Sequence, residues 1–149
     1  MMLNDKIAVD FKGAMKAKDS ARVSCLRMLK TSLKNMQVEK KRELTDEEIH
    51  AIISSSIRKC KEAVGEFIKG GREDLALKEK QEIKILYEYL PRQLTPEEIE
   101  KTLKEIISEL AATSPRDLGM VMKTTMTRIA GQAQGKEVSE IAGKLLAQK

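Results

Sequence analysis

Apolar residues recur at helical spacing along almost the whole chain of 149 residues. They return every three or four positions, the period that places side chains on one face of an α-helix. Over the first ninety residues this pattern predicts four helices, with a cap at Asp19 or Ser20 between the first two. Taken helix by helix, the apolar positions are Leu3, Ile7, Phe11 and Met15; Val23, Leu26, Leu29, Leu33 and Met36; Ile49, Ile52, Ile53, Ile57, Cys60, Val64, Phe67 and Ile68; and Leu75, Ile83, Leu86, Tyr87 and Leu90.

Start and stop signals mark the ends of these helices. The segments Thr45–Glu48 and Thr95–Glu98 both predict capping boxes, in which a threonine and a glutamate side chain satisfy free backbone N–H groups at the start of a helix. Pro96 suits the first turn of the helix after the second box. Gly70 and Gly71 end the third helix, and Pro91 stops the fourth helix at Leu90.

Three further helices follow the segment Leu90–Leu94, which is the predicted domain boundary. Their apolar positions are Ile99, Leu103, Ile106, Ile107 and Leu110; Leu118, Val121, Met122, Met126 and Ile129; and Val138, Ile141, Ala142, Leu145 and Leu146. We therefore predict an all-α protein with an N-terminal four-helix domain over residues 1–90 and a C-terminal three-helix bundle over residues 91–149. In the larger domain we expect five buried residues: Ile53, Ile57, Val64, Leu86 and Leu90.

Composition supports a helical protein and excludes other classes. The chain has 8 glycines, 3 prolines, 2 tyrosines, 2 phenylalanines and no tryptophan, fewer turn-forming and aromatic residues than an all-β fold requires. No apolar run is long enough to cross a membrane. The first residues lack the basic-then-apolar order of a signal peptide. We therefore expect a cytoplasmic protein with no membrane contact.

The chain offers few ligands for a metal. Cys25 and Cys60 lie on helical apolar stripes, where free thiols at the edge of a core are the simpler interpretation. His50 is the one histidine, and it falls in the first turns of a predicted helix without an identifiable partner. Four ligands at the spacing of a structural zinc site are not found. We predict no metal site and no cofactor.

No arrangement of residues predicts catalysis. Lys136 follows Gly135, but a phosphate-binding loop needs a serine or threonine after the lysine, where Glu137 stands. Ser54–Ser56 interrupt a helical apolar stripe and lack the glycine- and serine-rich surroundings of an amidase nucleophile. Cys25 has no identifiable base. We predict no catalytic residue in this chain.

Positive charge is concentrated near the start of the chain. Residues 1–42 hold 11 Lys and Arg against 4 Asp and Glu, whereas residues 43–90 hold 8 against 11 and residues 91–149 hold 9 against 8. Arg27, Lys30, Lys34 and Lys41 are spaced by three, four and seven, which places them on one face of the second helix. They either lie along the edge of the core with their charged groups in water or bind phosphates. Since aromatic residues are scarce, phosphate binding favours a folded RNA read by shape over a single strand held by stacking.

Several segments resemble the GatB/YqeY family. They are Tyr89–Ile99, Asp117–Met122, Gly131–Lys136, Leu26–Lys30 and Leu33–Asn35. The resemblance covers essentially the whole chain and implies the all-helical fold of a stand-alone YqeY-like protein. The same kind of unit forms the tail of the B subunit of the glutamine-dependent Asp/Glu-tRNA amidotransferase, where it is associated with holding tRNA.

The resemblance implies tRNA as a partner and adds candidate phosphate contacts in the C-terminal domain. With the three residues of the second helix, the predicted nucleic-acid-binding residues are Arg27, Lys30, Lys34, Lys123, Arg128, Lys136 and Lys144. The turn Gly131–Gly135 departs from the family, because Gln132 stands where lysine is usual and Gln134 where Asp or Asn is usual.

Two functions are compatible with these features. One is a non-catalytic accessory protein that interacts with tRNA. The other is a protein module that docks on the amidotransferase or on another translation component. The family is associated with carbon–nitrogen ligase activity with glutamine as amide donor, but the chain is too short to contain the amidase or the kinase-like domain of the parent enzyme, and we expect no catalysis by this chain alone.

Overall fold

The computed structural model describes residues 2–148. Within that range the chain forms seven α-helices, one short 3-10 helix and no strand, which confirms the all-α prediction. The helices are α1 (Leu3–Ala17), α2 (Ser20–Lys40), α3 (Asp46–Lys69), α4 (Glu73–Tyr87), α5 (Pro96–Leu110), α6 (Leu118–Arg128) and α7 (Gly135–Ala147), with the 3-10 helix Pro115–Asp117 before α6. The chain divides into two compact units, Met1–Leu90 and Pro91–Lys149. None of the described helices is both long and apolar enough to cross a membrane.

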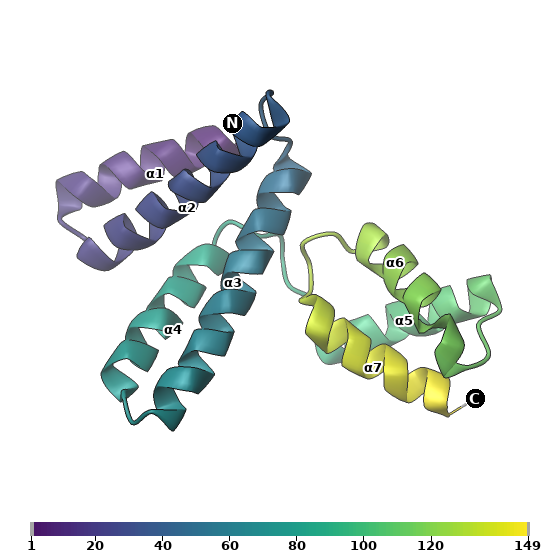
Figure 1. Ribbon diagram of the computed structural model, residues 1–149. Coiled ribbons are helices and arrows are strands. Elements are labelled where there is room, and N and C mark those ends of the chain that lie inside the picture. The colour runs from purple at the N-terminus through teal and green to yellow at the C-terminus, as the bar shows by residue number, and fades with distance from the viewer. Residues whose placement is uncertain (1, 149) are drawn as a thin grey trace. The chain divides into compact units, whose positions relative to one another are not determined.

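In the first unit the helices pack as two antiparallel pairs, α1 beside α2 and α3 beside α4 (Figure 1). The turn between α1 and α2 is short because Lys18 adopts the left-handed conformation and Asp19 caps α2, accepting a hydrogen bond from the Arg22 N–H. The predicted capping box of Thr45 and Glu48 is present at the start of α3. These local signals satisfy free backbone N–H groups at the starts of α2 and α3.

The core of this unit draws on all four helices. Its buried residues are Ile7, Cys25, Leu26, Leu29, Leu33, Leu44, Ile49, Ile53, Ile57, Ile85, Leu86 and Tyr89. The predicted burial of Ile53, Ile57 and Leu86 is confirmed, whereas Val64 and Leu90 are only half-buried. Helix α4 ends at Tyr87 rather than at Leu90, because the last residues before Pro91 form tighter turns in which the Tyr89 N–H donates to the Leu86 carbonyl.

Tyr89 lies in this final turn and is a core residue that the sequence pattern did not predict. Its hydroxyl donates a 2.6 Å hydrogen bond to the Asp10 carboxylate on α1. The Lys6 ammonium lies 4.8 Å from the centre of its ring. The end of α4 is thereby fixed against α1, at the opposite end of the unit's sequence.

The second unit packs α5, α6 and α7 against one another. Its core consists of Ile99, Leu103, Ile106, Ile107, Ala112, Val121, Ile129, Ala133, Val138, Ala142 and Leu146. The capping box of Thr95 and Glu98 starts α5, with Pro96 in the first turn as predicted. The loop after α6 is fastened to the segment before α5, since the Gln93 side chain donates to the Gly131 carbonyl at 2.7 Å and the Leu94 N–H donates to the Gln132 carbonyl at 2.8 Å. The turn Gly131–Gly135 therefore has a structural role in this unit.

Candidate nucleic-acid interface

An open groove follows α2 on its side toward α1, with a volume of about 830 Å³. Below it is called the α1–α2 groove. It forms where Lys41 adopts the left-handed conformation, ends α2 and turns the chain back toward α3. The lining residues are Asn4, Phe11, Arg27, Lys30, Thr31, Leu33, Lys34, Gln37, Val38, Lys41, Arg42 and Glu43.

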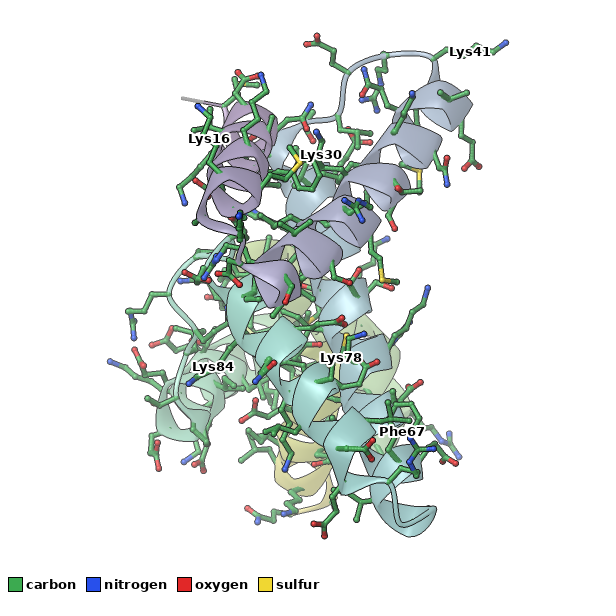
Figure 2. The ribbon with its side chains drawn as sticks, turned by 90° about the vertical axis from the view of Figure 1, so that its left-hand side faces the viewer. Lys16, Lys30, Lys41, Phe67, Lys78 and Lys84 are labelled. Carbon is green, nitrogen blue, oxygen red and sulfur yellow. The ribbon has the colours of Figure 1, made fainter. Side chains whose placement is uncertain are left out.

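The groove brings together all three cations that the sequence predicted on α2. Arg27, Lys30 and Lys34 line one wall, and Lys41 lies at the end of the helix. Figure 2 marks Lys30 near α1 and Lys41 at the far end of α2. Within residues 2–148 none of these four side chains forms an ion pair with a carboxylate. Their charges are therefore available to an anionic partner.

Phe11 of α1 organises part of this wall. The Lys30 ammonium lies 4.7 Å from the centre of the Phe11 ring, and the Arg27 guanidinium carbon lies 5.9 Å from it. Both distances are in the range of cation–π attraction. Lys30 is half-buried and Arg27 is exposed, so their alkyl chains follow the edge of the core while their N–H groups stay in the groove. The alkyl chains of Lys30 and Arg27 thus fit the interpretation in which they lie along the edge of the core. Their charged groups fit the interpretation in which they bind phosphates.

Two other cations near the groove share one carboxylate. Arg42 makes a bidentate contact with the Glu48 carboxylate, with Nη1–Oε1 at 2.7 Å and Nη2–Oε2 at 3.0 Å. The Lys40 ammonium lies 3.0 Å from the same carboxylate. The hydrogen bonds from Arg42 hold the pKa of Glu48 well below its usual range, and that from the Thr45 N–H acts in the same direction. Arg42 and Lys40 therefore strengthen the start of α3 and add less free charge to the groove.

The four predicted cations of the second unit are not equivalent. Arg128 of α6 makes a bidentate contact with Glu109 of α5, at 3.1 and 2.8 Å, and lowers the pKa of that carboxyl. Arg128 thus ties α6 to α5 through its planar guanidinium group. Lys123 on α6 and Lys136 and Lys144 on α7 are exposed, and the described residues place no carboxylate within ion-pair distance of them.

Neither thiol has the environment of a nucleophile. Burial is the main cause that raises the pKa of Cys25 to about 12, and burial is also the main cause that raises the pKa of Cys60 to about 12, with the nearby Glu79 carboxylate acting in the same direction. A reactive cysteine needs the opposite shift, because the thiolate is the nucleophile. The three serines of α3, Ser54–Ser56, are half-buried along the helix.

The chain is similar in sequence to curated proteins of several organisms that share one name. The chain is 33% identical over 104 residues to "Altered inheritance of mitochondria protein 41, mitochondrial" of Vanderwaltozyma polyspora, an alignment that covers 68% of this chain and 56% of the relative. The protein of the same name from Kluyveromyces lactis is 34% identical over 110 residues, covering 71% and 59%. That of Pyrenophora tritici-repentis is 26% identical over 145 residues, covering 93% and 80%. The chain thus spans a little over half the length of the first two relatives.

These names correct the expectation of a cytoplasmic location, which is wrong. The relatives are named as mitochondrial proteins. The expectation depended on the pattern of the first residues, whereas the shared sequence is that of the folded domains. A folded domain has the same core and surface chemistry in any compartment, so its pattern of apolar and polar residues does not indicate where the protein is located.

A family comparison agrees with the segments identified in the sequence. The family described as "Yqey-like protein" matches residues 4–146, which cover nearly all of both compact units and reach from α1 into α7. The chain therefore belongs to the YqeY family, the stand-alone relative of the tail of the amidotransferase B subunit.

Proposed function

We propose that this chain is a non-catalytic accessory protein that binds tRNA by its phosphates, with the α1–α2 groove as the main contact surface. The observation that carries the proposal is the gathering along one groove of four cations, Arg27, Lys30, Lys34 and Lys41, that form no ion pair within residues 2–148. tRNA is the proposed partner because the family resemblance links this kind of domain to holding tRNA. The chain's own contribution is to bind and orient the RNA.

The chemistry of the groove favours phosphate over base recognition. Lysine and arginine side chains supply charge and N–H donors, which fix an RNA backbone without reading its sequence. Base recognition in single strands uses aromatic rings as stacking platforms. In the groove the Phe11 ring has Lys30 against it, so that ring is engaged by a cation. A folded RNA with closely spaced phosphates matches this surface better than an unstructured strand.

Lys123, Lys136 and Lys144 form the second part of the proposal, as additional phosphate contacts from the C-terminal unit. They are exposed lysines without a carboxylate partner in the described structure. We do not propose Arg128 as a phosphate contact, because its guanidinium group is paired with the Glu109 carboxylate.

Filter binding with total tRNA at increasing salt tests the proposal. If about four phosphates are neutralised, a plot of log affinity against log salt should have a slope near −3 or −4. The double variant Arg27→Ala/Lys30→Ala should reduce the magnitude of that slope by about one to two units, with little change in preference among tRNAs.

The matched control is Lys69→Ala/Lys84→Ala, which removes two exposed lysines of α3 and α4 that do not line the groove. It changes net charge by the same amount and should leave the slope within about half a unit of the parent value. A flat salt dependence of the parent protein would rule out tRNA binding through phosphates. An equal reduction of the slope in both double variants would show that binding depends on the overall positive charge and not on the cations of the groove.

Protein docking is the second candidate function, and exposed apolar residues on α2 favour it. Met28 is 65% exposed and Val38 is 67% exposed, and apolar side chains of this kind are common anchors of protein interfaces. Under this alternative, Met28→Ser/Val38→Ser would abolish binding of the partner protein. The parent protein itself would have no affinity for tRNA.

A further inference from the structure

A thiol and two carboxylates converge between α3 and α4, away from the α1–α2 groove. The donor atoms of Cys60, Glu79 and Glu82 all lie within 4.8 Å of one another. Cys60 belongs to α3, while Glu79 and Glu82 are three residues apart on α4 and so share one face of that helix. Helix α4 runs beside the C-terminal part of the longer α3 (Figure 1).

We propose that Cys60, Glu79 and Glu82 bind one Zn²⁺ ion and so link α3 to α4. Zinc accepts sulfur and oxygen ligands together, at about 2.3 Å for sulfur and about 2.0–2.2 Å for oxygen. In a tetrahedral site these lengths place neighbouring sulfur and oxygen ligands about 3.6 Å apart. The Cys60 Sγ and the Glu82 Oε2 are 3.8 Å apart, where the thiol now donates to the carboxylate.

The electrostatics of this cluster favour a cation. Glu79 and Glu82 lie on one face of α4, and their carboxylate oxygens are within 4.8 Å of each other and of the Cys60 sulfur. Lys59 and Lys78 line the same hollow, yet across residues 2–148 neither of them comes within ion-pair distance of Glu79 or Glu82. Among the described residues, these two carboxylates therefore lie together beside a thiol without a cationic side chain in ion-pair distance, an arrangement that a divalent ion relieves.

The surroundings leave room for the ion and for water. A hollow of about 510 Å³ is lined by Cys60, Glu79 and Glu82 together with apolar residues such as Phe67 and Leu75. Figure 2 marks Phe67 and Lys78 on this pair of helices. Three protein ligands leave a fourth position for water or a small anion. A thiolate ligand selects zinc or cobalt over magnesium and calcium, which prefer oxygen alone.

Cys25 lies close to this cluster, but its thiol already has a hydrogen-bond partner. The Cys25 thiol is buried and donates to the main-chain carbonyl of Glu82 at 3.8 Å. It is therefore placed outside the proposed ligand set. This pair of thiols supplies a matched control, since a serine at either position is nearly the same size and removes one sulfur.

Cobalt titration of the full chain with reduced thiols is the test. We expect a thiolate-to-cobalt charge-transfer absorption that saturates at one equivalent per chain, disappears when Zn²⁺ is added, and is accompanied by a higher melting temperature. Cys60→Ser should abolish this absorption and Cys25→Ser should retain it. Glu79→Gln and Glu82→Gln, which keep side-chain size, should each weaken the affinity for cobalt by at least tenfold. Circular dichroism confirms that each variant is folded.

Binding must release the Cys60 proton, because the thiolate is the ligand. Since an ordinary cysteine thiol is mostly protonated below about pH 8, the affinity for Zn²⁺ should rise by up to about tenfold per pH unit between pH 6 and 8. An affinity that is flat over that range would exclude the thiolate and overturn the proposal. So would the absence of a charge-transfer band in the parent protein, its persistence in Cys60→Ser, or its loss in Cys25→Ser.

Discussion

The ammonium group of Lys30 lies 4.7 Å from the centre of the Phe11 ring, and this contact joins a cation of α2 to an aromatic residue of α1 in the lining of the groove. The guanidinium of Arg27 approaches the same ring. One aromatic side chain therefore restrains two of the cations proposed to contact phosphate. Restraint before binding lowers the entropy lost when an RNA backbone is held.

Replacing Phe11 with leucine should weaken tRNA binding more than it weakens the fold. Leucine keeps an apolar side chain against the half-buried site but removes the ring that positions Lys30 and Arg27. We expect a loss of tRNA affinity of about three- to tenfold, measured by filter binding at low salt. Phe67→Leu changes a phenylalanine outside the groove and should leave affinity unchanged; a similar loss there would argue against a specific role of Phe11.

Arg128 and Lys34, both in the predicted site, should differ in their effect on salt dependence. Arg128→Ala removes a guanidinium that Glu109 already neutralises, so the slope of log affinity against log salt should stay the same. Lys34→Ala removes a groove cation that has no carboxylate partner in the described part of the chain, and it should reduce the magnitude of the slope by about one unit. A slope change with Arg128→Ala equal to that with Lys34→Ala would show that Arg128 leaves Glu109 to bind RNA.

Tyr89→Phe should destabilise the first unit. The substitution deletes the hydroxyl that donates to the Asp10 carboxylate at 2.6 Å, and a hydrogen bond to a charged acceptor contributes about 1.5–3 kcal/mol when well formed. Because this site is partly exposed to solvent, we expect a loss of about 1 kcal/mol in the free energy of unfolding, measured by urea denaturation at pH 7.

The same tyrosine predicts a response to alkali. Burial, followed by the hydrogen bond to Asp10, raises the pKa of Tyr89 above its usual value. The unfolded chain therefore loses this proton first, and the stability that Tyr89 contributes is complete below about pH 10 and is lost as pH rises beyond it. Tyr89→Phe should make the free energy of unfolding less dependent on pH above about pH 10. An unchanged alkaline profile in Tyr89→Phe would contradict this assignment.

Glu98 predicts a response to acid in the second unit. Hydrogen bonds from Arg92 lower the pKa of Glu98 to about 2, and the Thr95 N–H contributes in the same direction. The unfolded chain binds this proton at a higher pH, near 4.3, so the contribution of Glu98 is present above that value and is lost as pH falls toward about 2. Glu98→Gln keeps a side-chain acceptor for the capping box but removes the charge. Its unfolding midpoint in urea should fall at pH 7 and match that of the parent protein near pH 2.

Short-range features of this protein are determined by its sequence. Both capping boxes, Thr45 with Glu48 and Thr95 with Glu98, are present as predicted, because each needs only two residues three positions apart. The helical period likewise predicts an all-α protein and the buried positions Ile53, Ile57 and Leu86. The spacing of Arg27, Lys30 and Lys34 predicts a shared face for the same reason, since one helix places them without help from any other part of the chain.

The tertiary structure decides which side chains from different helices meet. It buries Tyr89 against Asp10 from 79 residues away, pairs Arg128 with Glu109, and gathers Cys60 with Glu79 and Glu82. Counting cysteines and histidines gives no sign of this last cluster, because two of its three donors are carboxylates on the next helix. Helical periodicity states which face of a helix is apolar, but the rotation and offset between two packed helices follow from how their side chains interlock. That packing determines which cations remain free and which donors converge.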